Sequence, residues 1–160
     1  MSWPNRRFVL LAPLAVAACG FEPVYGPGGT GSLLRNRVLV DEPQIAETYL
    51  LTREIEERLG RGERAVYGLT LVILTSERQL AVNREGYIER FNLLGRVDYR
   101  LRDLTNGAIL SSGYVENFTA YSATGTTVVT LAGERDARER LMNIMADQIV
   151  ARLYAADLTR

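Results

Sequence analysis

The feature that most constrains the fold is a regular alternation of apolar and polar residues over residues 88–103. One set of alternating positions is apolar or small: Phe91, Leu93, Gly95, Val97, Tyr99 and Leu101. The other set carries Asn92, Arg96, Asp98, Arg100 and Arg102. A period of two residues is that of a β-strand, whose side chains point alternately to opposite faces. The sequence therefore predicts a long strand with one buried face and one polar face.

Three further stretches have strand character. Residues 66–76 are apolar at both alternating sets of positions, which favours a central strand, and residues 80–82 retain strand character within the polar segment that follows. Asn106-Gly107 is a hairpin signal, and residues 108–121 are predicted to form the returning strand. Its residues spaced by four, on one face, are Leu110, Tyr114 and Phe118. A short apolar run at residues 38–40 suits a buried strand.

Two segments have the period of an amphipathic helix. Residues 43–59 begin with a proline after two acidic residues and carry the stripe Thr48, Leu51, Ile55 and Leu59. The opposite face, with Glu54, Glu56 and Glu57, is expected to be solvated, and Glu54 and Arg58 have the spacing of an ion pair. Residues 131–154 carry a second stripe: Ala137, Leu141, Ile144, Met145, Ile149 and Leu153. A loop is expected over residues 122–130.

The order of these elements predicts an α+β fold for residues 33–160, in a single domain. We expect a two-layer sandwich in which two helices pack on one face of a small, mostly antiparallel sheet of about four strands.

The first eighteen residues have the pattern of a secretory signal peptide. Arg6 and Arg7 precede an apolar run over residues 8–18, which is too short to span a bilayer. Small residues lead directly to Cys19, the only cysteine, which is the pattern of a bacterial lipoprotein signal. We expect residues 1–18 to be removed, Cys19 to be lipidated, and residues 19–32, rich in Gly and Pro, to form a flexible tether. The alternative is that Cys19 is a buried free thiol.

Composition excludes several classes of function. The 19 basic residues are all arginines and equal the 19 acidic ones, so a sequence-independent nucleic-acid binder is not expected. The chain has no lysine for Schiff-base chemistry and no histidine for a catalytic triad or a metal site. No carboxylate lies in a recognisable acid–base motif. We therefore expect no enzyme, metal or cofactor, although a carboxylate-based hydrolase remains an alternative.

Arginines on the polar face of the long strand are the candidate site: Arg90, Arg96, Arg100 and Arg102. Like charges about 7 Å apart along a strand repel each other unless anionic groups lie nearby. Two interpretations stay open. Asp98 and Glu116 can neutralise a solvated face, or an anionic ligand can bind there, since the guanidinium fork suits phosphate and carboxylate.

The sequence Cys19-Gly20-Phe21-Glu22-Pro23-Val24-Tyr25-Gly26 resembles the start of the mature lipopolysaccharide-assembly lipoprotein family, LptE. The likeness continues more loosely in the predicted architecture, in residues 108–113 and in residues 134–140. The resemblance implies an outer-membrane lipoprotein, anchored on the periplasmic face, that plugs and helps to assemble the LptD-type β-barrel delivering lipopolysaccharide to the outer leaflet. The absence of Asp after Cys19 fits the outer membrane.

The family resemblance further implies that basic residues of the sheet bind lipopolysaccharide, and the four arginines are the candidates here. Another class of function also fits a lipoprotein of this size, namely an adaptor subunit of a different envelope transport complex.

Overall fold

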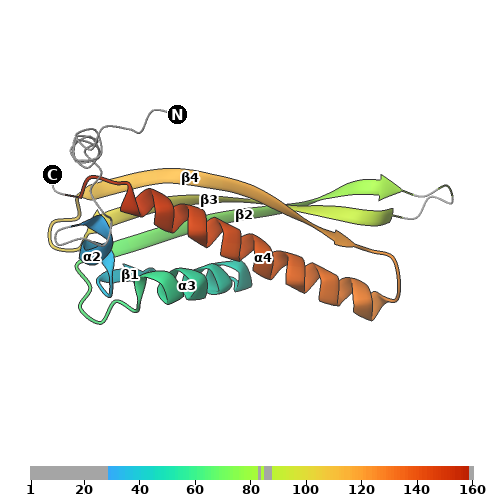
Figure 1. Ribbon diagram of the computed structural model, residues 1–160, viewed down its shortest axis with the longest axis horizontal. Coiled ribbons are helices and arrows are strands. Elements are labelled where there is room, and N and C mark those ends of the chain that lie inside the picture. Colours follow the sequence, from blue (N-terminus) through green and yellow to red (C-terminus); the bar gives the residue numbers. More distant parts are fainter. Residues whose placement is uncertain (1–28, 83, 85–87, 159–160) are drawn as a thin grey trace, which may run out of the picture.

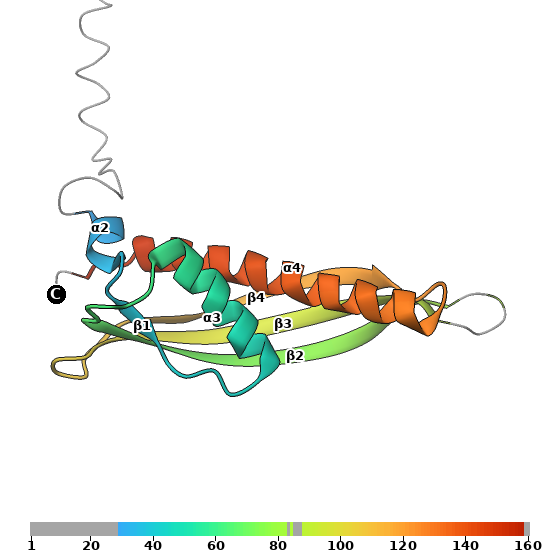
Figure 2. The ribbon, with the colours of Figure 1, turned by 90° about the horizontal axis from the view of Figure 1, so that it is seen from below.

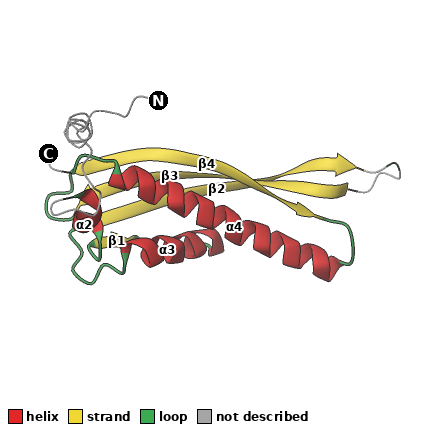
Figure 3. Cartoon of the chain, viewed as in Figure 1, coloured by secondary structure: helices red, strands yellow, loops and turns green. Residues whose placement is uncertain are grey.

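The computed structural model describes residues 29–82, 84 and 88–158. The predicted signal peptide and Cys19 lie outside the described residues. The elements run in the order α2 (Thr30–Leu34), β1 (Val38–Val40), α3 (Ala46–Leu59), β2 (Tyr67–Val82), β3 (Ile88–Asp103), β4 (Ile109–Ser122) and α4 (Thr127–Tyr154) (Figures 1 and 3).

The strands form one open, mixed sheet in the order β1-β2-β3-β4. β1 pairs in parallel with β2, and the other neighbours are antiparallel. The predicted α+β class, the four strands and the mostly antiparallel sheet are thus confirmed. β3 has the bounds that its alternation predicted. At the predicted hairpin, Gly107 has a φ of 74°, which favours glycine, and its N–H donates to the Asp103 carbonyl at 2.8 Å.

Both long helices cover the same face of the sheet, as predicted (Figure 2). α4 packs on β3 and β4, and α3 packs on β1 and β2. Side chains of the helices and the inner sheet face form one core, whose fully buried members include Leu51, Ile55, Leu69, Val97, Leu101, Leu141, Met145 and Ile149. The helix α4 approaches β3 closely at Gly95, where an added Cβ would lie 3.0 Å from the side chains of Leu141 and Met145.

The structure extends two elements beyond their predicted bounds and adds one short helix. β2 continues through the polar segment to Val82, because β3 pairs with it as far as Ile88. On the inner face there, the Phe91 ring stacks on Tyr121, whose hydroxyl donates to Glu77 at 3.1 Å. α4 begins at Thr127, inside the expected loop. The short helix α2 begins at Thr30, inside the segment expected to be a tether.

The outer side of β2 corrects the expectation of a central strand buried on both faces. Val72 and Leu74 are 55% and 64% exposed. β1 pairs with β2 only at residues 67–69, so β2 is an edge strand over most of its length. β2 and β3 together form a long hairpin that gives the molecule its elongated shape (Figure 1). Within the described ranges, no helix has the length and apolarity needed to cross a bilayer.

Candidate functional site

The sheet face turned away from α3 and α4, here called the outer face, is bare in the part of the chain that the structure describes (Figure 2). The register defines it as three rows across β2, β3 and β4: Thr70–Arg100–Ser112, Val72–Asp98–Tyr114 and Leu74–Arg96–Glu116, with Ser76–Leu94–Phe118 as a fourth. Asp98 lies between Val72 and Tyr114, and Arg96 lies between Leu74 and Glu116, so charged and apolar residues alternate on this face. The outer face is amphipathic, as a surface for an amphiphilic ligand has to be.

Arg96 is the most heavily paired arginine of the outer face. Its Nη1 donates to Glu116 Oε1 at 2.8 Å, and its Nη2 donates to Asp98 Oδ1 at 3.0 Å. Its guanidinium lies 4.0 Å from the centre of the Tyr114 ring, within cation–π range. The hydrogen bonds that Arg96 donates to Asp98 and Glu116 raise the pKa of Arg96, and the same bond to Asp98 lowers the pKa of Asp98. Asp98 and Glu116 thus neutralise this part of the row, as one of the two sequence interpretations proposed.

Arg102 fastens three segments together. Its guanidinium donates to both carboxylate oxygens of Asp41, in the segment after β1, and its Nη1 donates to Thr70 Oγ1 of β2 at 2.6 Å. The Arg102 hydrogen bond holds the pKa of Asp41 below its usual range, against the opposing effect of burial. A bidentate pair of this kind fixes geometry. Arg102 therefore serves the fold, and its guanidinium is already engaged.

Arg100, in the row Thr70–Arg100–Ser112, differs from Arg96 and Arg102 because its guanidinium is unpaired within the described ranges. Its side chain is exposed and, among the described residues, has no ion-pair or hydrogen-bond partner. It lines a shallow hollow of about 290 Å³ with Val72 and Tyr114. Arg90 is also exposed, but it pairs with Ser122 toward the far end of the hairpin, about 20 Å along β3 from Arg96. The structure thus separates the four arginines into different roles.

An apolar groove lies beside Arg96, and the sequence interpretation missed it. Its volume is about 480 Å³, and its lining residues include Leu74, Leu94 and Phe118, with Arg96 and Glu116 at one side. Phe118 is 61% exposed and Tyr114 48%. The predicted shared face of these two aromatics is confirmed, whereas Leu110 packs against the core beyond a bulge. Only the strand order could show that Leu74 of β2 and Phe118 of β4 flank the same arginine.

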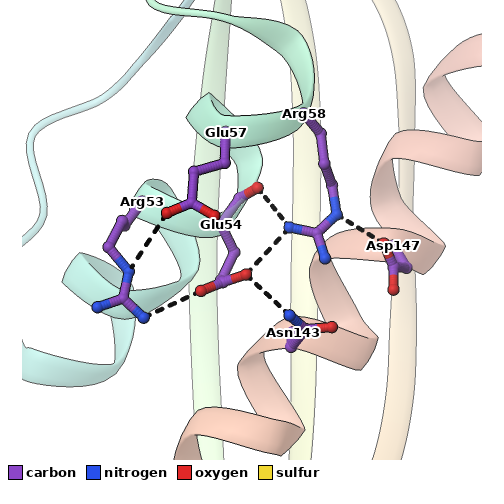
Figure 4. A network of polar contacts seen from close by, with 6 residues as sticks. All are labelled: Arg53, Glu54, Glu57, Arg58, Asn143 and Asp147. Atoms are coloured by element: carbon purple, nitrogen blue, oxygen red, sulfur yellow. Dashed lines mark hydrogen bonds and ion pairs between the residues drawn. The ribbon is translucent and has the colours of Figure 1, made fainter.

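Glu54 corrects another expectation, since it is not solvated. The residue is 8% exposed and lies where α3 meets α4 (Figure 4). Its carboxylate accepts hydrogen bonds from Arg53 at 3.0 Å, Arg58 at 3.1 Å and Asn143 at 2.9 Å. Arg58 also donates to Asp147 at 2.6 Å, so the network joins the two helices. Burial raises the pKa of Glu54, but the hydrogen bonds from Arg53 and Arg58 outweigh burial and lower it overall.

The carboxylates near Glu54 are poorly suited to acid–base catalysis. Asp136 and Glu139 line the same hollow of about 380 Å³, but Asp136 pairs with Arg140 at 3.0 Å. A general acid needs a raised pKa, whereas the pKa of Glu54 is lowered. Over residues 29–82, 84 and 88–158, no three acidic residues are grouped so as to hold a metal ion. The arrangement favours a structural junction over the hydrolase alternative.

A comparison with protein families decides the relationship. The family described as "LptE: Lipopolysaccharide-assembly" matches residues 36–153. The chain belongs to the LptE family. The matched range runs from β1 nearly to the end of α4 and so includes the whole outer face. No curated protein matches the chain.

Solved structures have the same fold as this LptE-family chain. A Caulobacter crescentus CB15 protein, described as a lipoprotein, is 25% identical, with a TM-score of 0.68 over 79% of this chain and 93% of that one. Lipoprotein B of Nitrosomonas europaea is 21% identical, with a TM-score of 0.59 over 85% and 91% of the two chains. The rare lipoprotein B of Shewanella oneidensis is 13% identical, with a TM-score of 0.55 over 74% and 92%.

Proposed function

We propose that this chain is an outer-membrane lipoprotein, acylated at Cys19 after removal of residues 1–18, that docks in the lumen of an LptD-type β-barrel and binds lipopolysaccharide on its outer face. It acts without catalysis, by plugging the barrel, helping its assembly and presenting a binding surface. The observation that carries this proposal is membership of the LptE family over residues 36–153. The description of the Caulobacter crescentus relative as a lipoprotein supports the anchor.

The chemistry of the outer face supports lipopolysaccharide as the ligand. Lipid A combines phosphates with acyl chains, so its binding surface has to offer cations beside apolar area. Arg100 offers a guanidinium without a carboxylate partner among the described residues. Its hydrogen bonds to a phosphate would be charge-assisted, and such bonds are stronger than those between neutral groups. The groove beside Arg96, with Leu74 and Phe118 in its lining, offers the apolar area. Arg96 is already paired with Asp98 and Glu116, whose negative charges compete with phosphate for its guanidinium.

The exposed surface of α4, on the side opposite the outer face, suits the polar lumen of a barrel. After a first turn with exposed Val128 and Val129, the first half of α4 carries exposed charged residues, among them Arg135, Glu139 and Arg140. Such a surface is compatible with polar walls, whereas a hydrophobic partner surface would have to leave these charges unpaired.

The first experiment measures binding of lipopolysaccharide to the purified acylated protein in detergent. Loss of one charge-assisted hydrogen bond costs about 1.5–3 kcal/mol, so Arg100→Ala is expected to weaken binding by roughly ten- to a hundred-fold. Arg135→Ala removes another exposed charge, from α4, and serves as the matched control. Equal affinities of the wild type and Arg100→Ala would refute the outer-face site.

The second experiment tests the barrel partner. The acylated protein, purified from detergent-solubilised membranes of its host, is expected to bring with it a large β-barrel protein in a one-to-one ratio. Recovery of a different envelope transport complex without such a barrel would instead support the adaptor alternative.

A further inference from the structure

Four exposed arginines gather at the end of the molecule where the described chain begins. We call them the basic end: Arg35, Arg37, Arg61 and Arg64. Two belong to the connection between α2 and β1, and two to the connection between α3 and β2. Backbone hydrogen bonds hold these connections together, from the Asn36 N–H to the Leu59 carbonyl at 2.7 Å and from the Val66 N–H to the Arg37 carbonyl at 2.9 Å. The basic end is therefore a fixed feature of the fold.

The basic end carries excess positive charge. Its arginines line a hollow of about 440 Å³ together with Asn36 and Glu63. Arg61 pairs with Glu56 at 3.4 Å, but the other three arginines have no carboxylate partner among the described residues. Four arginines against Glu56 and Glu63 leave a net charge of 4 − 2 = +2. Like charges held this close repel each other, and an anionic surface would relieve that repulsion.

The position of the basic end in the chain indicates which anionic surface it meets. Ten peptide units separate Cys19 from Gly29, so they span at most about 35 Å. An anchor at Cys19 would keep Gly29, just before α2, within that distance of the bilayer. We infer that the basic end docks on anionic phospholipid headgroups of the leaflet that holds the acyl chains of Cys19. This inference rests on the proposed acylation.

Docking would also set the orientation of the molecule. α2 and the connection between α3 and β2 lie at one end of the long axis, and the end of β2 and the start of β3 lie at the other (Figures 1 and 2). In a bilayer that holds no barrel protein, the basic end then lies on the headgroups and the hairpin points away from the membrane; docking in the barrel lumen would replace this orientation. Each arginine near an anionic surface contributes about fivefold in binding, equivalent to about 1 kcal/mol.

The test uses the acylated protein reconstituted in two kinds of vesicle. One is made of zwitterionic phospholipid alone, and in the other about a quarter of the phospholipid is anionic. Acylation occupies Cys19, the only cysteine, so a single introduced cysteine can carry a fluorophore. Ser32→Cys places it in α2 beside the basic end, and Leu80→Cys places it toward the far end of the hairpin. A headgroup-bound quencher reports proximity to the membrane, and vesicle flotation reports the anchor independently.

In anionic vesicles, the fluorophore at position 32 is expected to be quenched and the one at position 80 to stay unquenched. Arg35→Gln combined with Arg64→Gln should lower the docking equilibrium about 25-fold, two factors of five. As the control, Arg84→Gln combined with Arg135→Gln removes the same amount of charge elsewhere and should change the docking equilibrium less than twofold. If the protein floats with the vesicles but quenching at position 32 is the same without anionic lipid, or the same after the Arg35 and Arg64 substitutions, docking is overturned and the anchor is not. Protein that does not float would overturn the anchor and the inference with it.

Discussion

At the scale of single residues, the surroundings of a guanidinium decide what it can do. Arg96 and Arg100 lie on the same face of β3, about 14 Å apart. Arg96 is bound by two carboxylates, whereas Arg100 has none among the described residues. If the outer face binds phosphate, the acids around Arg96 compete with the ligand. Their removal should therefore strengthen binding, which is the opposite of what loss of a structural ion pair would do.

Glu116→Gln tests this competition. The substitution removes the negative charge that pairs with Arg96 Nη1, so lipopolysaccharide affinity is expected to rise several-fold. Binding titrations with the acylated protein measure it. Glu139→Gln removes an exposed acid from α4 and should leave affinity unchanged. An affinity that falls in Glu116→Gln would mean that the pair only shapes the face and does not mask a binding group.

Glu54→Gln tests the buried junction between α3 and α4. Because the folded-state pKa of Glu54 is lowered, its carboxylate stabilises the fold above its unfolded pKa of about 4.3 and loses that effect as the pH falls through the folded value. We expect Glu54→Gln to lower the free energy of unfolding by about 1–2 kcal/mol at pH 7, and the difference from the wild type to shrink below about pH 4.

Urea unfolding across this pH range measures both effects of Glu54→Gln. Glu57→Gln, one turn along the same helix and exposed, is the control and should stay within about 0.5 kcal/mol of the wild type. A pH-independent difference for Glu54→Gln would show that the charge of Glu54 is not what stabilises the junction.

At the scale of elements, the sequence predicts what local pattern controls. β3 has the expected bounds because its alternation coincides with burial: Leu93, Val97 and Leu101 are all buried. The sequence predicts strand character for residues 80–82 but not the continuity of β2 through residues 77–79, because those residues are polar and are held as a strand by the partner β3. The same limit applies to the outer face. Arg96 and Arg100 could be named from one strand, but the groove needs β2 and β4 in register, which no single strand specifies.

The contact of α4 with β3 gives a prediction at this scale. Gly95→Leu places a side chain where Leu141 and Met145 already lie 3.0 Å from an added Cβ. Overpacking of this kind costs about 1–3 kcal/mol, so the midpoint of urea unfolding should fall. Ser112→Leu adds similar bulk on the bare outer face and should cost less. Equal stabilities of Gly95→Leu and the wild type would mean that α4 does not sit as close to β3 as described.

At the scale of the whole molecule, the fold separates three surfaces. One sheet face holds the helices and the core, the outer face stays open, and the basic end lies at one tip of the long axis (Figure 2). This separation of surfaces suits a protein that acts by binding several partners rather than by catalysis. An anchored end, a surface for lipid and a charged helical side can then be engaged at the same time.

Photocrosslinking in the native host tests the central claim, that the outer face meets lipopolysaccharide. A photoreactive amino acid at Phe118 samples the apolar groove, and one at Glu139 samples the exposed side of α4. Illumination followed by immunoblotting detects lipopolysaccharide adducts. The account predicts an adduct at position 118 and none at position 139. Adducts at neither position, or at position 139 alone, would contradict it.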